Sequence, residues 1–288
     1  MKIISTISEM QNIARSARNA GLKIAVVPTM GCLHDGHISL IKKAKKVANF
    51  VIVTIFVNPT QFGENEDFSE YPRTFDNDSK ICKELDVDAI FAPNDKEMYS
   101  EDASTWVEEV KLSQNLCGKS RSGHFRGVTT VVTKLFNATL PDKAVFGQKD
   151  AQQALIIKRM VRDLNFPINI IISPTIREED GLALSSRNKY LTAEERKNAP
   201  RINQLLKEIK TQLTNDKEIT NVKNFKRYFS DEISKINGTV DYIEILDANS
   251  LTEISQNQFQ NIKNVDILIA VAVYLGSTRL IDNELIIR

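Results

Sequence analysis

Residues 26–40 read VVPTMGCLHDGHISL, and this stretch decides the fold of the chain around it. The apolar run Ile24–Val27 predicts a short buried strand. Pro28 ends the run, and Gly31 and Gly36 give the backbone the freedom that a tight turn needs. The pattern therefore predicts a strand that leads through a turn directly into a helix.

Two of the three histidines in the chain, His34 and His37, follow this turn. On a helix their spacing places both imidazoles on one face, and the helix N-terminus offers unpaired N–H groups that suit a phosphate. A histidine pair can also lie on the surface or form half of a metal site, although the zinc-protease pattern HExxH is not met. Gly36 stands between the two and allows a ligand to approach the backbone closely, which favours nucleotide binding.

The composition limits the possible partners. A chain of 288 residues with 42% hydrophobic and 26% charged residues is typical of a globular protein with one large or two modest domains. Its net charge of +1 gives no electrostatic attraction to nucleic acid or to an anionic membrane. We therefore expect small-molecule ligands, with no nucleic acid and no membrane.

The cysteines and the apolar runs indicate the compartment. The three cysteines are widely separated, which argues against a disulfide framework or a zinc ribbon and fits a reducing environment. The N-terminus lacks the apolar core of a signal peptide. The longest apolar run, Ile267–Leu275, is too short to span a bilayer. These features predict a cytoplasmic protein.

Up to about residue 175, apolar runs alternate with helical stretches. The expected strands are Ile24–Val27, Phe50–Val57, Ala89–Ala92, Ala144–Phe146 and Ile168–Ile172. The expected helices are Ile38–Ala48, Asp76–Leu85, Val128–Asn137 and Asp150–Leu164. This order implies βαβ crossovers and a parallel sheet, in which ligands bind at the carboxyl ends of the strands. We therefore predict an α/β fold with a Rossmann-like N-terminal domain over residues 1–178.

After about residue 180 the pattern changes to that of a smaller α+β domain, which we place at residues 179–288. The expected elements are helices near 193–215 and 219–236, strands over Val240–Asp247 and Asp266–Leu275, and a hairpin return over Ser277–Ile281. Thr192 and Glu195 have the spacing of a capping box that opens a helix over Ala193–Lys210. The polar stretch Gln256–Asn264 is expected to be a loop. This domain would act as a cover or as a wall on the substrate side.

Polar residues follow the predicted strand Phe50–Val57 in the segment VNPTQFGENEDFSEYPRTFDND. Asn58 and Gln61 carry amides, which both donate and accept hydrogen bonds and suit a substrate with hydroxyl groups and a carboxylate. The same two residues could instead belong to an ordinary surface turn. The acidic residues of the segment are expected to be mostly solvated; they are Glu64, Glu66, Asp67, Glu70, Asp76 and Asp78.

Glycines and cations are interleaved in the segment LCGKSRSGHFRGVTTVVTKLFN. They predict a mobile loop over residues 118–127, ahead of the helix Val128–Asn137. Such a loop could be a lid that closes over phosphates, or it could be an exposed connector, and the sequence favours neither. The third histidine, His124, is not expected to be catalytic.

Two further segments, VFGQKDAQQALIIKRMV and PTIREEDGLALSSRNKYLT, place cations and hydroxyl groups after predicted strands. Lys149 can bring a positive charge to a phosphate. Asp150 can cap a helix or hold Mg²⁺, and Gln153 lies one turn further along the same side. The run Ser185–Arg187 presents two hydroxyl groups and a guanidinium together.

The segment PTMGCLHDGH, over residues 28–37, resembles the HxGH signature of the nucleotidyltransferase superfamily. Together with the four later segments, in this order, it resembles the pantothenate synthetase (pantoate–β-alanine ligase) family. In that family the counterpart of Ser185–Arg187 resembles the KMSKS loop of class I synthetases, which stabilises the leaving pyrophosphate. The chain departs from the family pattern at Gln148, where a glutamate is usual, and at Ala151, where an aromatic residue is usual.

The resemblance implies an ATP-dependent ligase that makes pantothenate from pantoate and β-alanine through a pantoyl adenylate, with Mg²⁺ and as a homodimer. The residues implied in catalysis are His34, His37, Lys149, Ser185, Ser186 and Arg187. Those implied in nucleotide binding are Met30, Gly31, Cys32, Leu33, His34, Asp35, Gly36, His37, Gly147, Gln148, Lys149, Asp150, Ile176, Leu184, Ser185, Ser186 and Arg187. Asn58, Gln61 and Gln153 are implied in pantoate binding, and Asp150 in binding Mg²⁺.

Two other functions stay open on the sequence. A cytidylyl- or adenylyltransferase shares the HxGH turn but transfers to a phosphorylated acceptor, and the paired glutamines speak against it. A nucleotide-binding regulator without turnover would not need charged residues at every strand end. A nucleotide-binding assay combined with a pyrophosphate-release assay separates these functions.

Overall fold

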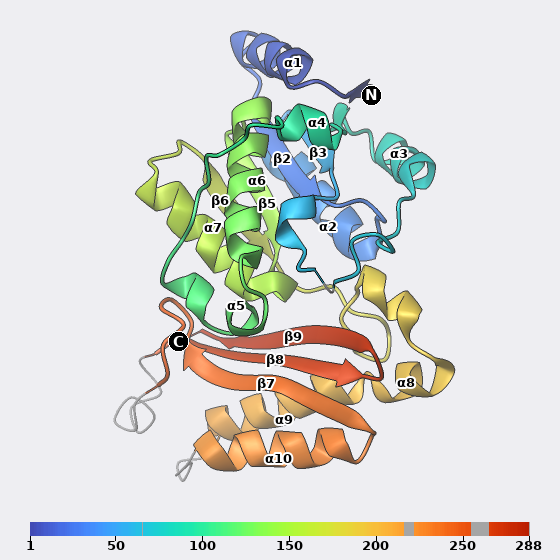
Figure 1. Cartoon of the computed structure of the whole chain (residues 1–288), viewed down its shortest axis with the longest axis vertical. Coiled ribbons are helices and arrows are strands. Elements are labelled where there is room, and N and C mark those ends of the chain that lie inside the picture. The colour runs from blue at the N-terminus through green and yellow to red at the C-terminus, as the bar shows by residue number, and fades with distance from the viewer. Residues whose placement is uncertain (65, 216–221, 255–264, 288) are drawn as a thin grey trace. The chain divides into compact units, whose positions relative to one another are not determined.

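The computed structural model describes residues 1–64, 66–215, 222–254 and 265–287, which form two compact units (Figure 1). The first unit comprises Met1–Gln114, Gly118–Gln148 and Gln153–Pro174. The second comprises Asn115–Cys117, Lys149–Gln152 and Thr175–Arg288. Two short segments that precede residue 178 in the chain therefore group with the second unit.

The first unit is built on a six-stranded parallel sheet, as the alternation of strands and helices predicted. The strand order is β1 (Lys2–Ile4), β4 (Ala89–Phe91), β3 (Phe50–Ile55), β2 (Ile24–Thr29), β5 (Lys143–Gly147) and β6 (Asn169–Ser173). The helices around this sheet include α1 (Ile7–Asn19), α2 (Asp35–Val47), α3 (Phe75–Glu84), α4 (Asp95–Met98), α6 (His124–Thr139) and α7 (Ala151–Asp163). Because the strands are parallel, their carboxyl ends lie at the same edge of the sheet.

The central strand β2 is buried on both faces, which explains its continuous apolar sequence. Ala25 and Val27 pack in one cluster with Ile41 of α2, so that α2 covers that face of the strand. Ile24 and Val26 point to the opposite face and are also fully buried. Burial of both faces holds the strand rigidly, and with it the turn that follows its carboxyl end.

The second unit contains a three-stranded antiparallel sheet of β7 (Gly238–Asp247), β8 (Ile267–Leu275) and β9 (Thr278–Ile286). The helices α9 (Arg201–Asn215) and α10 (Val222–Ser234) cover one face of this sheet and share a core with it (Figure 1). This arrangement confirms the predicted smaller α+β part of the chain. The return strand is longer than the predicted Ser277–Ile281. The predicted helical residues 219–221 and the predicted loop Gln256–Asn264 lie outside the described residues.

The helix predicted over Ala193–Lys210 is interrupted in the structure. It is divided into α8 (Ala193–Asn198) and α9, with Pro200 between them, because proline has no N–H to donate inside a helix. Thr192 and Glu195 form the predicted capping box, with hydrogen bonds of 3.3 and 2.8 Å. None of the helices in the described ranges is both long and apolar enough to cross a membrane.

Residues 118–127 are mostly helical, and the prediction that they form a loop is wrong. The short helix α5 (Cys117–Ser120) includes the first of them, and α6 begins at His124, four residues earlier than predicted. A Cβ atom on Gly118 or on Gly127 would overlap a backbone carbonyl oxygen of another segment. The two glycines are therefore needed for close packing, and their presence in the sequence does not signal a loop.

Candidate active site

The turn between β2 and α2 has a backbone conformation that requires glycine at its start. Gly31 has φ of 82°, and Cys32 has φ of 51°. A Cβ atom on Gly31 would lie only 3.0 Å from Asp78 Oδ2. The N–H of Gly31 donates to Thr29 Oγ1 at 3.1 Å. The turn is thus closely surrounded, and it ends at His34, which is the N-cap of α2.

The two histidines cap the N-terminus of α2 together. His34 Nδ1 accepts the N–H of Gly36 at 3.2 Å, and His37 Nδ1 accepts the N–H of His34 at 3.3 Å. Their ring centroids are 4.1 Å apart, as the spacing on one helix face predicted. A neutral imidazole whose Nδ1 accepts a hydrogen bond carries its proton on Nε2. Each ring therefore has an N–H donor on the side away from the backbone that it caps.

A buried carboxylate supports this turn, and the sequence analysis missed it. Asp78 is fully buried, and its two oxygens accept the N–H groups of Cys32 at 2.9 Å and Leu33 at 2.8 Å. The prediction that Asp78 is solvated is wrong. Asp78 and the buried Cys82 are four residues apart and share one face of α3, but this spacing alone does not predict that a carboxylate is buried.

Asn58 and Gln61 lie beyond the carboxyl end of β3, around the 3₁₀ turn η1 (Pro59–Gln61). Asn58 is only 1% exposed, and its Nδ2 donates to Gln61 Oε1 at 3.1 Å. The Tyr99 hydroxyl donates to Asn58 Oδ1 at 2.9 Å. Gln61 Nε2 lies 3.1 Å from Met30 Sδ. This chain of hydrogen bonds fixes the orientation of the Gln61 amide, with its NH₂ group as the end that can donate to a ligand.

His124 and Arg121 hold the backbone of the same turn. His124 Nδ1 lies 2.7 Å from the carbonyl oxygen of Gln61, which can only accept, so that Nδ1 carries the proton. Arg121 Nη1 lies 3.0 Å from His124 Nε2 and can only donate to it. His124 is therefore a neutral, buried histidine that supports Gln61.

Arg121 is in turn paired with Glu66, and the Nη2–Oε2 distance is 2.6 Å. Burial alone would raise the pKa of the Glu66 carboxyl, but the hydrogen bond and the charge of Arg121 outweigh burial and lower this pKa. The prediction that Glu66 is mostly solvated is wrong, since its side chain is 25% exposed. The carboxylate keeps Arg121 in place beside the turn that carries Gln61.

The other predicted residues of the first unit lie near the same edge of the sheet. Gly147 ends β5, and β5 pairs in parallel with β2. Gln148 follows directly, and the half-buried Gln153 stands near the start of α7. The first unit therefore places the predicted Met30–His37 turn and Gly147 at the carboxyl ends of adjacent strands.

In the second unit, Lys149 and Asp150 belong to the 3₁₀ turn η3 (Gln148–Asp150). Lys149 Nζ lies 4.0 Å from Asp150 Oδ2, and the Asp150 side chain is 48% exposed. Asn283 Nδ2 donates to the carbonyl oxygen of Lys149 at 2.8 Å and anchors the turn to β9. The two opposite charges are thus held on an anchored backbone and stay accessible to solvent.

The predicted Ser-Ser-Arg run lies at the start of the 3₁₀ turn η4 (Ser186–Tyr190). Ser185 is the N-cap of this turn, and its Oγ accepts the N–H of Arg187 at 3.3 Å. The N–H of Leu184 donates to the carbonyl oxygen of Ile176 at 3.0 Å. These contacts bring Ile176, Leu184 and the Ser-Ser-Arg run together on one loop.

Arg177 anchors this loop to β9 through a bidentate pair with Asp282, at 2.6 and 2.9 Å. Asp282 is 5% exposed, and the variant Arg177→Met leaves its carboxylate buried without its cation. We expect the free energy of unfolding in urea to fall by about 3 kcal/mol. Arg162→Met, which breaks an exposed ion pair with Asp163, is the control and should change it by less than about 1 kcal/mol. If the free energy of unfolding falls equally in the two variants, Arg177 does not stabilise the protein by pairing with the buried Asp282.

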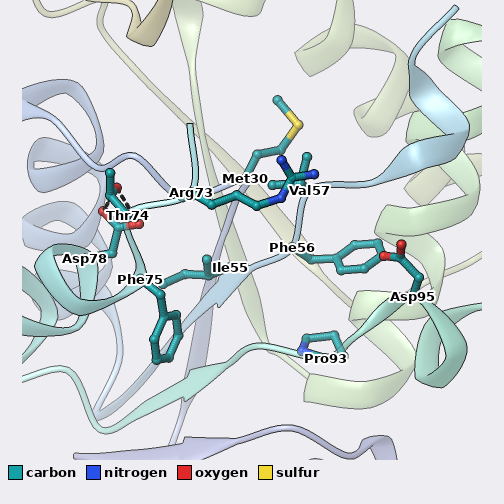
Figure 2. Close-up of a pocket in the computed structure, with 11 residues that line it drawn as sticks. Met30, Ile55, Phe56, Val57, Arg73, Thr74, Phe75, Asp78, Pro93 and Asp95 are labelled. Atoms are coloured by element: carbon teal, nitrogen blue, oxygen red, sulfur yellow. Dashed lines mark hydrogen bonds between the residues drawn. The ribbon is translucent and has the colours of Figure 1, made fainter. Parts of the chain in front are cut away.

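A cavity of about 260 Å³ opens beside the β2–α2 turn in the first unit (Figure 2). Its walls are mostly apolar and include Met30, Ile55 and Phe56. Asp78 lies at one end of the cavity in Figure 2 and Asp95 at the other. The volume is below the usual range of about 300–1,000 Å³ for drug-sized ligands, so that the cavity suits a small substrate better than a whole nucleotide.

The family model described as pantoate-beta-alanine ligase matches residues 2–285. The chain belongs to this family. It is 47% identical over 287 residues to the pantothenate synthetase of Acetivibrio thermocellus, with 99% of both chains covered. It is 50% identical over 284 residues to that of Clostridium acetobutylicum, with 98% of both chains covered. These matches confirm the resemblance found in the HxGH turn and the later segments.

Solved structures of the family share the fold over the whole chain. The pantothenate synthetase of Thermus thermophilus is 39% identical, with a TM-score of 0.88 and 99% of both chains covered. The pantoate-beta-alanine ligase of Francisella tularensis, solved with beta-gamma ATP and beta-alanine, is 37% identical, with a TM-score of 0.80 and 99% and 97% covered. The predicted fold class is thereby confirmed. As a member of the pantoate–β-alanine ligase family, the chain is a ligase that forms an amide bond.

Proposed function

We propose that the chain makes pantothenate from pantoate, β-alanine and ATP in two half-reactions. The pantoate carboxylate attacks the α-phosphorus of ATP, and pyrophosphate leaves as the P–O bond to it breaks. The β-alanine amine then attacks the carbonyl carbon of the pantoyl adenylate, which forms the amide and releases AMP. The observation that carries the proposal is the mutual capping of His34 and His37, which gives the turn two Nε2–H donors in a family that joins these substrates.

The two imidazoles act by hydrogen bonding. Because both Nδ1 atoms accept backbone N–H groups, the neutral tautomer with the proton on Nε2 is fixed before the substrate arrives. Donors that are already oriented stabilise the charge that builds up on the phosphate oxygens without the cost of reorganisation. His34 and His37 therefore contact the phosphate chain of ATP. The rate enhancement comes from positioning of the reactants, and no covalent enzyme intermediate is formed.

Gln61 binds pantoate through its NH₂ group, with Gln153 as the second amide. The burial of Asn58 and its bond to Gln61 Oε1 give it a positioning role rather than the direct substrate contact that the sequence implied.

Cations and hydroxyl groups are further proposed to contact the phosphates. Lys149 and Arg187 bring positive charge, and Ser185 and Ser186 bring hydroxyl donors to the leaving pyrophosphate. The remaining residues predicted to bind nucleotide, on the turn and around Lys149, are proposed to line the ATP site.

Mg²⁺ fits this site through a single carboxylate. Within the described part of the chain, no group of three or more His, Cys, Asp or Glu side chains is arranged to hold a metal ion. Mg²⁺ usually keeps several waters and binds one or two carboxylates together with substrate phosphates. The accessible side chain of Asp150 can provide one such carboxylate. Bound there, Mg²⁺ would neutralise phosphate charge.

Pyrophosphate release from ATP and Mg²⁺, measured with and without each acceptor, tests the proposed function. We expect release to require pantoate, and AMP and pantothenate to appear only when β-alanine is added. Release that needs a phosphorylated acceptor instead would indicate a nucleotidyltransferase. ATP binding with no release under any of these conditions would indicate a regulator, and both outcomes would overturn the proposal.

Asn58→Asp tests the orientation of Gln61. Aspartate cannot donate to Gln61 Oε1 or to the carbonyl oxygen of Gly127, both of which Asn58 Nδ2 contacts. The Gln61 amide is then expected to turn over and to present its oxygen to the pantoate carboxylate. We expect the KM for pantoate to rise about 10-fold while the KM for ATP changes little. Asn94→Asp is the matched control, because either residue can cap α4.

We also propose that the protein is a homodimer in the cytoplasm, on the basis of the family resemblance and of composition. We further propose that its domains are residues 1–178 and 179–288. Light scattering of the purified protein tests whether it is a dimer. A mass equal to one chain at the concentration of the assay would exclude the dimer.

A further inference from the structure

Asp78 is a buried carboxylate whose hydrogen bonds go mainly to the backbone of the HxGH turn. One of its oxygens accepts the N–H of Cys32 and the other accepts the N–H of Leu33. The Thr74 hydroxyl lies 3.2 Å from both oxygens, and dashed lines mark these hydrogen bonds in Figure 2. A carboxylate is seldom fully buried, and it is stable there only when donors surround it. The conformation of the turn and the burial of Asp78 therefore depend on each other.

The negative charge of Asp78 affects the groups around it. Burial, together with the negative charge of Asp78, raises the pKa of the Cys82 thiol to about 12. Cys82 therefore stays a neutral thiol on the same face of α3. The N–H groups of Cys32 and Leu33 point at a negative charge, which makes these hydrogen bonds stronger than those to a neutral acceptor.

The two N–H donors stand directly before the histidine pair. Cys32 adopts a left-handed conformation, and Leu33 precedes His34, the N-cap of α2. If Cys32 and Leu33 rotate, His34 loses the backbone geometry that lets its ring and the ring of His37 cap the helix. We propose that Asp78 is the positioning residue of this turn, which fixes the direction of the Nε2–H groups of His34 and His37. This inference rests on the proposed phosphate contacts of the two histidines.

Only a carboxylate of this length meets the geometry. An asparagine has one acceptor atom, and its NH₂ group would face a backbone N–H of the turn, so that one of the two hydrogen bonds becomes a repulsive contact. A glutamate would need space for an additional methylene group at a position that is fully buried. The role is therefore specific to aspartate at this position.

Asp78→Asn is the main test, with Asp76→Asn as the matched control. Asp76 stands on the same turn of α3 but is exposed, so that the control removes the same charge without touching the turn. We expect Asp78→Asn to lower the kcat of pantoate-dependent pyrophosphate release about 10-fold or more, while the KM for pantoate stays within about twofold. The control should match the wild type. A kcat for Asp78→Asn equal to that of the control would overturn the inference.

Imidazole ¹⁵N chemical shifts provide a readout that a loss of stability alone would not move. The chain has three histidines, so that the spectrum of the full-length protein contains three pairs of signals. In the wild type we expect protonated Nε2 in His34 and His37 and protonated Nδ1 in His124. Asp78→Asn should shift the signals of the first two toward a mixture of tautomers and leave those of His124 in place. Unchanged signals for all three residues would contradict the inference.

Thr74→Val and Thr74→Ser keep the inference testable if Asp78→Asn does not fold. Valine removes the hydroxyl donor to Asp78 at nearly constant volume, and serine retains it. We expect about a threefold lower kcat and shifted histidine signals for valine, and wild-type behaviour for serine. Wild-type kcat and spectra for valine would overturn the inference.

If the wild type releases no pyrophosphate with pantoate, the proposed function fails. The histidine tautomers, measured by NMR, still test the role of Asp78 in that case.

Discussion

Replacing His37 by asparagine should lower the kcat of pantoate-dependent pyrophosphate release by about 100- to 1,000-fold, the usual effect of losing one donor to developing charge. Replacing it by glutamine should lower kcat by only about 10-fold. The KM for pantoate should change little in either variant, because the proposed pantoate contact is Gln61, which lies on a different turn. This difference between two amides would show which ring nitrogen of His37 is used in catalysis.

The two variants separate the two nitrogen atoms of the imidazole. The asparagine amide reaches the position of Nδ1 and can still accept the N–H of His34, but it places no donor where Nε2 lies. The glutamine amide reaches the position of Nε2 and can donate there, but it loses the cap. We therefore expect glutamine to be the less stable variant, by about 1 kcal/mol, and asparagine to be the less active one.

Single-turnover formation of the adenylate and urea unfolding are the two measurements. Lys42→Gln is the control, since Lys42 is exposed on the same helix and should behave as wild type in both. Near-wild-type adenylate formation in His37→Asn would exclude Nε2 as a donor. Equal kcat values for the asparagine and glutamine variants would show that His37 acts only as a helix cap.

The strand, the turn and the histidine pair could be predicted because their signals are local. An apolar run, a glycine and a spacing of three residues all lie within Ile24–His37, and burial of β2 on both faces matches its uninterrupted apolar sequence. The same holds for the Thr192 capping box. Such features depend on residues that are close in the chain, so that no knowledge of tertiary contacts is needed.

The supports of the site could not be predicted in this way. Asp78 bonds to Cys32 and Leu33 across 46 and 45 residues, and its charge alone suggested an exposed residue. Asn58 is predicted from the sequence to contact the substrate, but it is 1% exposed and its amide donates to Gln61, which the sequence does not indicate. In each case the side chain has the chemistry of a surface residue, and only long-range packing determines that it points inward.

Gly127→Ala should also lower the activity strongly, because it displaces the turn that carries Gln61. The Cβ atom would lie 2.6 Å from the carbonyl carbon of Thr60 and 2.8 Å from Gln61 Cα, both of which are backbone atoms that cannot rotate away. The first turn of α6 and η1 must then separate. Because Asn58 Nδ2 donates to the Gly127 carbonyl at 3.2 Å, the group that orients Gln61 moves as well.

A displacement of about 1 Å at a substrate-positioning group typically costs on the order of 100-fold in rate, and we expect kcat/KM for pantoate to fall by that factor. Overpacking should also lower the free energy of unfolding by about 1–3 kcal/mol. Gly63→Ala is the matched control, because a Cβ atom there meets Glu66 Cγ at an ordinary 3.7 Å. If Gly127→Ala loses stability but keeps kcat/KM for pantoate, the close approach of α6 serves only the fold. A loss of both, with KM for ATP unchanged, would mean that the glycine sets the position of the Gln61 amide and would support the proposed contact with pantoate.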